Sequence, residues 1–315
     1  MRKTKIRSRG FRSREIPEGG RFRGRGASAL YTHAMEVADS PELLAYRLVG
    51  RELTPDSTVI EVRGRRIGDG FFGLIAGPCT VETREQTLET ARAVAAAGAT
   101  ILRGGAFKPR TSPYAFQGLG RKGLEILVEA REETGLPIVT ELLDPRDVEE
   151  IAEVADVIQI GARNMQNFNL LAEVGRVPKP VLLKRSPAAT VEELLMAAEY
   201  VAKEGNERVI LCERGIKTFE RSTRYTLDLS AVPVLKRETH LPVIVDPSHA
   251  AGRSDLVLPL ARAAVAAGAD GVMIEVHPRP EDALCDGPQQ IRVGEFARFA
   301  DEIRTLVALM GKTVG

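Results

Sequence analysis

Residues 73–103, GLIAGPCTVETREQTLETARAVAAAGATILR, contain one complete strand–helix–strand pattern. The run at 73–76 is short and apolar, which is typical of a buried strand. Residues 84–97 then place apolar side chains at helical spacing, and a second short apolar run follows at 100–103. This order of elements predicts a βαβ unit with two parallel strands.

The same pattern recurs along the rest of the chain. Further buried strands are expected at 137–140, 157–160, 181–184, 209–212, 243–246 and 272–275. Further helices are expected at 119–134, 145–154, 167–174, 190–204, about 226–236, 255–267 and 295–310. Eight strands that alternate with eight helices over roughly 240 residues predict a closed α/β barrel, the (β/α)8 TIM barrel, at 71–315. A doubly wound open sheet is the alternative.

Residues 36–70 are expected to form a short extension ahead of the barrel. Ser40 and Pro41 predict the start of a helix at 40–50, and residues 58–67 predict a small hairpin that turns at Gly64. The sequence GDGFFG at 68–73 fits the G-x-G-x-x-G pattern of dinucleotide-binding folds. It precedes a strand and opens no helix, so we exclude that interpretation.

Residues 1–35 are predicted to be a disordered basic tail. Residues 1–26 carry ten Lys or Arg and two Glu, and they have too few aliphatic side chains to offset the entropy of ordering. The segment has no apolar core typical of a secretory signal. A solvated tail, a start at Met35, an organellar transit peptide and an RNA-binding Arg-Gly tail are the alternatives.

The overall composition limits the class of protein. A net charge of +1 over 315 residues argues against a nucleic-acid partner for any part but the tail. No apolar run approaches the ~18 residues of a membrane span, so no membrane partner is expected. Three widely spaced cysteines, at positions 79, 212 and 285, form no disulfide framework, which predicts a cytoplasmic protein.

Positive side chains gather after the predicted strands. The stretch LRGGAFKPRTSPYAFQG, residues 102–118, combines three cations with two hydroxyls: Arg103, Lys108, Arg110, Thr111 and Ser112. Later strand ends add Arg163, Lys184, Arg185 and Arg214. Active-site groups of such barrels lie at the C-terminal ends of the strands. Seven cations around one barrel mouth repel each other unless anions neutralise them, which predicts one or two phosphorylated substrates.

A possible metal site follows the first, seventh and eighth strands. Its candidate ligands are Cys79, His249, Glu275 and Asp286. The first and eighth strands are neighbours in a closed barrel, so these side chains can converge. A thiolate, an imidazole and two carboxylates suit Mn, Fe, Co or Zn. Cys79 could instead be a small core residue, and His277 and Cys285 are competing ligands. Cys212 has no ligand neighbour and is expected in the core.

Seven motifs occur in a fixed order: IAGPC, LRGGAFKPRTSPYAFQG, IQIGARNMQN, VLLKR, LCERG, VDPSHAAGR, and EVHP followed by CDG. This series resembles the 3-deoxy-D-arabino-heptulosonate 7-phosphate (DAHP) synthase family, in its short microbial type Iβ form. The resemblance implies a TIM barrel that condenses phosphoenolpyruvate with erythrose 4-phosphate and releases phosphate, the first step of the shikimate pathway to aromatic amino acids. It also implies a divalent metal ion and a homotetramer or homodimer.

The resemblance also assigns roles to residues. The metal ligands fall on Cys79, His249, Glu275 and Asp286. The phosphoenolpyruvate contacts fall on Arg103, Lys108, Arg163, Lys184 and Arg214. The contacts to the phosphate of erythrose 4-phosphate fall on Arg110, Thr111 and Ser112. Lys108 is the expected proton donor or electrostatic catalyst, beside the catalytic metal ligands Cys79 and His249, and Glu141 or Glu213 is expected to orient water.

Two departures and three alternatives accompany this resemblance. The family's DPSHSGG reads DPSHAAG here, and Ser186-Pro187 stands where Gly is expected.

The nearest enzyme alternative is 3-deoxy-D-manno-octulosonate 8-phosphate synthase, which uses arabinose 5-phosphate. The loop of that enzyme is closer to KANR than to the KPRT of residues 108–111. A metal-free form of the synthase is disfavoured by Cys79. A protein that binds RNA through its basic tail and has an inert barrel is the alternative of another class.

Overall fold

The computed structural model describes residues 46–315. The predicted disordered tail at 1–35, and residues 36–45 of the predicted extension, lie outside this range. Among the described residues, no helix combines the length and the apolar character needed to cross a membrane.

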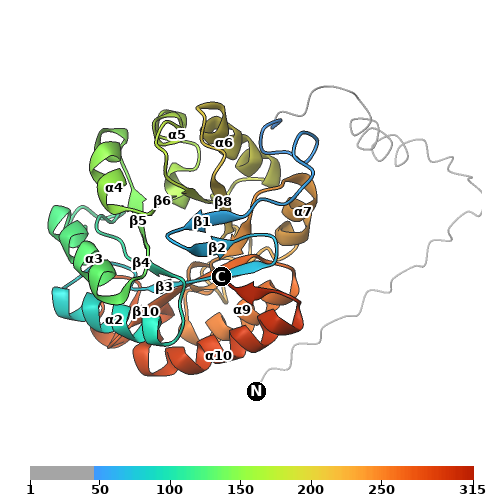
Figure 1. Ribbon diagram of the computed structural model, residues 1–315. Helices are drawn as coiled ribbons and strands as arrows, with labels where there is room; N and C mark the ends of the chain where they lie inside the picture. The colour runs from blue at the N-terminus through green and yellow to red at the C-terminus, as the bar shows by residue number, and fades with distance from the viewer. Residues whose placement is uncertain (1–45) are drawn as a thin grey trace, which may run out of the picture. The chain divides into compact units, whose positions relative to one another are not determined.

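Eight parallel strands form a closed barrel, as predicted (Figure 1). The strands are β3 (Phe71–Gly77), β4 (Ile101–Arg103), β5 (Ile138–Leu142), β6 (Val157–Ile160), β7 (Val181–Lys184), β8 (Val209–Glu213), β9 (Val243–Val245) and β10 (Gly271–His277). Each strand pairs with the next along the chain, and β10 pairs with β3 to close the barrel. This closure excludes the open doubly wound sheet.

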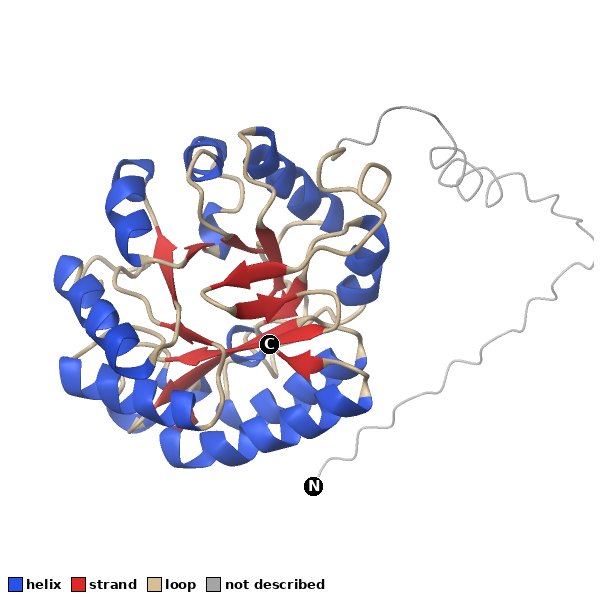
Figure 2. Ribbon diagram, in the orientation of Figure 1, coloured by secondary structure: helices blue, strands red, loops and turns tan. Residues whose placement is uncertain are grey.

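Helices surround the strands (Figure 2). They are α2 (Arg84–Ala96), α3 (Arg121–Thr134), α4 (Val148–Val154), α5 (Phe168–Gly175), α6 (Val191–Lys203), α7 (Ala231–Glu238), α8 (Pro247–Ala251), α9 (Val257–Ala266) and α10 (Val293–Leu309). Side chains cap the N-termini of α2 and α6 and so determine where these two helices begin. The hydroxyl of Thr83 accepts from the N–H of Gln86, and Thr190 forms a reciprocal capping box with Glu193.

The described chain has two apolar cores. One lies between the strands and the helices. The other fills the barrel interior with at least one side chain from each strand, including Ile75, Ile101, Val139, Val157, Leu182, Ile210, Ile244 and Met273. Cys212 belongs to this interior core, as predicted.

A hairpin ahead of the barrel joins the interior core. It consists of β1 (Ile60–Val62) and β2 (Arg65–Ile67), which pair antiparallel within the predicted range 58–67. Arg63 and Gly64 both have positive φ, as the type I′ form of a two-residue hairpin turn requires. Ile60, Val62 and Ile67 pack with the interior side chains, so the hairpin closes one end of the barrel (Figure 1). The active-site groups must therefore use the other end.

Two sequence predictions differ from the structure. The helix expected at 226–236 is α7, which begins at Ala231, because Ile216 and Thr226 bridge and keep the preceding segment in a loop. Residues 46–50 of the helix expected at 40–50 are not helical. The N–H groups of Leu48 and Val49 donate to the Glu199 carboxylate instead, so side-chain acceptors on α6 replace helical carbonyls.

Two short strands, one on each side of α10 in the chain, extend the sheet. β11 (Ile291–Arg292) pairs with β10, and β12 (Thr313–Val314) pairs with β3. β11 follows directly on the loop that carries Cys285 and Asp286, so it holds the far end of that loop against the barrel.

Candidate active site

A cavity of about 450 Å³ opens at the C-terminal ends of the barrel strands. Nearly all of the residues singled out from the sequence line it: Cys79, Arg103, Lys108, Arg110, Thr111, Ser112, Arg163, Lys184, Arg214, His249 and Asp286. Glu275 lies directly behind this wall, in contact with Arg103 and His249. The strand-end positions of these residues thus gather them around one space.

The loop between β4 and α3 supplies the hydroxyls and two of the cations. Its base is closed by a bridge between Phe107 and Gly118, and the N–H of Lys108 donates to the Gln117 carbonyl. Gly118 has φ of +95°, and a Cβ there would meet the Ala106 carbonyl oxygen at 2.2 Å. This tight closure projects residues 108–112 over the cavity.

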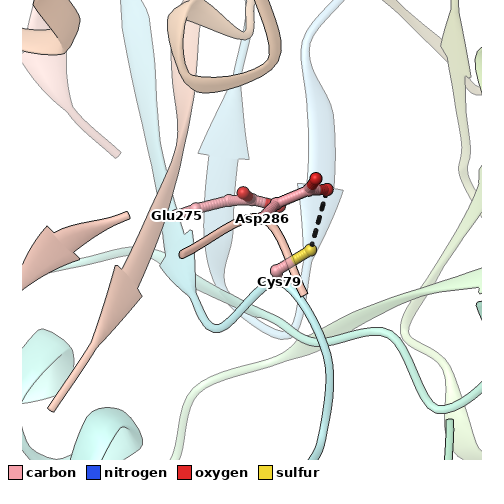
Figure 3. A group of neighbouring side chains, drawn as sticks. All are labelled: Cys79, Glu275 and Asp286. Atoms are coloured by element: carbon pink, nitrogen blue, oxygen red, sulfur yellow. Dashed lines mark hydrogen bonds between the residues drawn. The ribbon is translucent and has the colours of Figure 1, made fainter. Parts of the chain in front are cut away.

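Three acidic or thiol groups gather at the floor of the cavity: Cys79 and Asp286 line it, and Glu275 lies directly behind them (Figure 3). One ligand atom each from Cys79, Glu275 and Asp286 lies within 4.8 Å of the others. The Cys79 Sγ contacts an Asp286 oxygen at 3.5 Å. Oε1 of Glu275 is buried and has no hydrogen-bond partner among the described residues, although Arg103 Nη2 lies 2.9 Å away. A buried carboxylate oxygen without a hydrogen bond suits coordination to a cation.

His249 is held as a neutral imidazole beside this cluster. Its Nδ1 lies 2.7 Å from Asp246 Oδ2, and its Nε2 lies 3.4 Å from Glu275 Oε1. Burial lowers the pKa of His249 to about 4, so the ring is neutral at pH 7. The buried Asp246 accepts a hydrogen bond from Nδ1–H and also pairs with Lys184. This arrangement leaves Nε2 free of a proton, as a metal ligand requires.

Lys108 lies among the groups of the floor. Its Nζ is 2.7 Å from Cys79 Sγ and 3.5 Å from Asp286. Burial raises the pKa of the Cys79 thiol well above its usual range, and Lys108 opposes that shift. Burial likewise acts to raise the pKa of Asp286, but the positive charges of Lys108 and Arg224 hold it below its usual range. The positive charge of Lys108 therefore favours the thiolate form of Cys79 and the carboxylate form of Asp286, which are the forms that bind a metal ion.

Other cations also line the cavity. Arg163 follows β6, and Arg214 follows β8 and stacks its guanidinium 4.4 Å above the Tyr225 ring. Arg103 is buried, and its Nη1 has no hydrogen-bond partner within residues 46–315. An unpaired donor on a buried guanidinium is suited to a carboxylate or a phosphate.

The structure separates residues that the sequence placed together. Arg185 does not line the cavity; its guanidinium binds Glu213 and Asp228, each at 2.9 Å. Glu213 is completely buried, pairs with Arg185, and also accepts from the N–H of Gly215.

Glu141, the other carboxylate expected to orient water, does line the cavity, next to Gln159. The carboxylate of Glu141 takes the space of any side chain at Gly161, where a Cβ would lie 1.9 Å from Oε1.

Several residues at the site were not found from the sequence. Arg224 reaches the cavity from the loop before α7 and binds Asp286 at 3.2 Å. Gln289 donates to Glu275 at 2.6 Å, and Gln290 accepts from the N–H of Cys79 at 3.2 Å. A polar residue in a loop carries no periodic signal, so only the spatial arrangement identifies these three.

A family model described as the DAHP synthetase I family matches residues 56–310. The chain belongs to this family. A phospho-2-dehydro-3-deoxyheptonate aldolase of Thermotoga maritima is 55% identical over 272 residues, which cover 86% of this chain and 80% of that protein. A 2-dehydro-3-deoxyphosphooctonate aldolase of Syntrophotalea carbinolica is 35% identical over 269 residues, 78% of this chain and 96% of that protein.

Solved structures of the family share the barrel. The crystal structure of the Thermotoga maritima DAHP synthase matches with a TM-score of 0.84 and 53% identity, over 87% of this chain and 80% of that chain. A truncated form of the Thermotoga maritima synthase matches with a TM-score of 0.81 and 50% identity, over 86% of this chain and 100% of that chain.

Proposed function

We propose that this protein is a DAHP synthase, which condenses phosphoenolpyruvate with erythrose 4-phosphate and releases inorganic phosphate. The observation that carries the proposal is a single cavity that combines cationic walls with a thiol–carboxylate floor. The cations suit two phosphorylated substrates, and the floor suits a divalent metal ion. The 55% identity to a phospho-2-dehydro-3-deoxyheptonate aldolase supports this reaction over that of the more distant octonate aldolases.

The metal would be held by Cys79, His249, Glu275 and Asp286. Glu275 Oε1, which is buried and makes no hydrogen bond within residues 46–315 although Arg103 lies 2.9 Å away, and the unprotonated Nε2 of His249 support this assignment. The mixed set of ligands is compatible with Mn, Fe, Co or Zn. When bound, such an ion supplies Lewis acidity that polarises a carbonyl oxygen.

The cationic walls would hold the two substrates in separate places. The carboxylate and phosphate of phosphoenolpyruvate would bind to Arg103, Lys108, Arg163, Lys184 and Arg214. The phosphate of erythrose 4-phosphate would bind to Arg110, Thr111 and Ser112, at the outer part of the cavity. This division orients C3 of phosphoenolpyruvate toward the aldehyde carbon, which lowers the entropic part of the barrier.

The side chains of the site would then serve the chemistry in order. C3 of phosphoenolpyruvate forms a bond to the aldehyde carbon, and Lys108 donates a proton to the aldehyde oxygen. Glu141 orients a water molecule that adds at C2, where positive charge develops, and it accepts a proton from that water. Phosphate leaves from the resulting hemiketal, and C2 becomes a ketone. Glu141 is preferred to Glu213 because Glu141 lines the cavity and Arg185 already neutralises Glu213.

A choice of sugar phosphates tests this proposal. The protein, supplied with Mn²⁺ and phosphoenolpyruvate, receives either erythrose 4-phosphate or arabinose 5-phosphate, and phosphate release is measured. The proposal predicts turnover with the four-carbon sugar and little with the five-carbon sugar. The opposite preference would assign the chain to octulosonate synthesis, and no turnover with either would reject both reactions.

We further propose a cytoplasmic enzyme that assembles as a homotetramer or homodimer. Its three cysteines are free thiols, which suits a reducing compartment. Light scattering on the purified chain measures the assembly, and a monomer would contradict this part of the proposal.

A further inference from the structure

We infer that Glu82 and His277 form a positioning pair that holds the three metal-ligand segments in register. Neither residue touches the cavity, and neither is a proposed ligand. The inference deepens the proposed function, because it assumes the metal site at Cys79, Glu275 and Asp286.

The pair lies where the three segments meet. Glu82 comes three residues after Cys79, and His277 comes two residues after Glu275. The Glu82 carboxylate accepts from the N–H of Leu284 at 3.0 Å, and Leu284 comes two residues before Asp286. The other oxygen of Glu82 lies 3.4 Å from His277 Nε2. One carboxylate therefore contacts both of the other segments.

Hydrogen bonding fixes the form of the His277 ring. Its Nδ1 accepts from the N–H of Arg279 at 3.1 Å, so that nitrogen carries no proton. The proton of a neutral ring is then on Nε2, which faces the Glu82 carboxylate at 3.4 Å and makes no hydrogen bond within residues 46–315. The side chains of His277 and Glu82 are only 3% and 6% exposed, so water does not replace this contact. Nδ1 is engaged and Nε2 is turned toward Glu82, and His277 does not belong to the group formed by Cys79, Glu275 and Asp286, so we do not assign His277 as the alternative metal ligand that the sequence allowed.

The segment that carries Asp286 needs such an anchor. Asp286 itself adopts a left-handed backbone conformation, with φ of 49° and ψ of 29°, which is uncommon for a residue with a side chain. Residues 278–290 contain only two short 3₁₀ turns and no strand. The Leu284 N–H bond to Glu82 fixes this segment two residues before the strained position. Loss of that bond allows Asp286 to relax away from Cys79.

Metal affinity is therefore the property that the pair should control. A ligand that must be ordered before it binds reduces the apparent affinity, and outer partners of metal ligands typically contribute 10–100-fold. We expect Glu82→Ala and His277→Ala each to weaken metal binding by about 10–100-fold. The double variant should bind metal about as weakly as Glu82→Ala, because that change already removes the Glu82–His277 contact together with the bond to Leu284.

The experiment is a titration of metal-stripped full-length protein with Co²⁺, which reports the Cys79 bond through thiolate-to-metal charge-transfer absorbance. Glu82→Ala, His277→Ala, the double variant and wild type are compared, with circular dichroism to establish folding. Glu82→Met keeps a side chain of similar size without an oxygen acceptor and serves if the alanine variant does not fold. His277→Gln places an amide N–H near the position of Nε2 and should recover most of the affinity.

Asp282→Ala is the matched control, because it removes the exposed Arg279–Asp282 ion pair from the same segment. It should bind Co²⁺ within twofold of wild type. At saturating metal, the Glu82 variant should regain its kcat and keep the wild-type KM for phosphoenolpyruvate, which a catalytic residue would not do.

Wild-type affinity in both alanine variants would overturn the inference, as would equal weakening in Asp282→Ala. A wild-type protein that binds no Co²⁺ would overturn the inference and the proposed metal site together. Since the titration contains no substrate, a protein that shows the predicted Co²⁺ series but has no synthase activity would refute only the proposed reaction.

Discussion

Replacement of Asp246 by Asn should destabilise the fold strongly while it preserves the shape of the site. The Asp246 carboxylate is completely buried, pairs with the nearly buried Lys184, and accepts from His249 through both the backbone N–H at 2.9 Å and Nδ1. Asn removes the charge and leaves the ammonium group of Lys184 unpaired. Breaking a buried ion pair in this way costs about 3–5 kcal/mol. At about 2–4 °C per kcal/mol, the melting temperature should fall by roughly 6–20 °C.

Calorimetry of metal-free protein at pH 7 measures this effect. Lys184→Met/Asp246→Asn removes both charges and should be more stable than Asp246→Asn alone. Asp255→Asn, which breaks the exposed Arg253–Asp255 pair, is the control and should leave the melting temperature unchanged. An Asp246→Asn protein that melts within 2 °C of wild type would refute the argument, and so would a double variant that is less stable than the single.

The effect should also depend on pH in a definite direction. His249 and Lys184 hold the pKa of Asp246 well below its usual range, against the opposing effect of burial. A carboxyl whose pKa is lower in the folded than in the unfolded protein stabilises the fold at pH values above its unfolded pKa of about 3.9. This stabilisation is lost as the pH falls through the folded-state pKa. The difference between wild type and Asp246→Asn should therefore be largest near neutral pH and shrink below about pH 4. A difference that grows in acid would contradict this sign.

Three further changes test individual roles. Glu141→Gln should lower kcat by about 10²–10⁴-fold with the KM for phosphoenolpyruvate nearly unchanged, and an unaltered kcat in steady-state kinetics would remove Glu141 from the mechanism. Arg110→Ala should raise the KM for erythrose 4-phosphate at least tenfold (~1.4 kcal/mol) but not the KM for phosphoenolpyruvate; an equal rise in both would contradict the separate phosphate sites. The hydrogen bond with Cys79 lowers the pKa of Cys285 to about 6, so diamide should join the two thiols in chelated protein by accepting their two electrons and two protons. A peptide map without a Cys79–Cys285 linkage would rule this out.

Hydrophobic patterning predicted most of the barrel because parallel strands are buried on both faces. The predicted runs at 157–160 and 181–184 coincide with β6 and β7. The helix predicted at 226–236 is misplaced because Asp228, inside that window, donates its N–H to Glu213 and binds Arg185. Those contacts hold residues 226–230 outside the helix, and no local sequence signal reveals a partner 15 residues away. Leu48 and Val49 differ for the same reason, since their acceptor lies on α6.

The candidate site was predictable where a strand end determines position. Cys79, Lys184, His249 and Glu275 all follow or end barrel strands, and closure brings them together. The pairing of each charge was not predictable. Arg185 directly follows Lys184, and successive side chains of a strand point to opposite faces. Arg185 therefore points to Glu213 instead of the cavity. The loop residues Arg224, Glu82, Gln289 and Gln290 act through contacts between distant segments, which a single sequence does not encode in any regular pattern.

The central claim is that the thiol–carboxylate floor and the cationic walls form one metal-dependent site. The most direct test is phosphoenolpyruvate consumption in the presence of erythrose 4-phosphate, measured while Mn²⁺ is titrated into exhaustively chelated protein. We expect no turnover without metal and a return of activity that saturates at one Mn²⁺ per chain, with Cys79→Ala requiring far more Mn²⁺. Full activity after chelation, or an identical titration for Cys79→Ala, would contradict it.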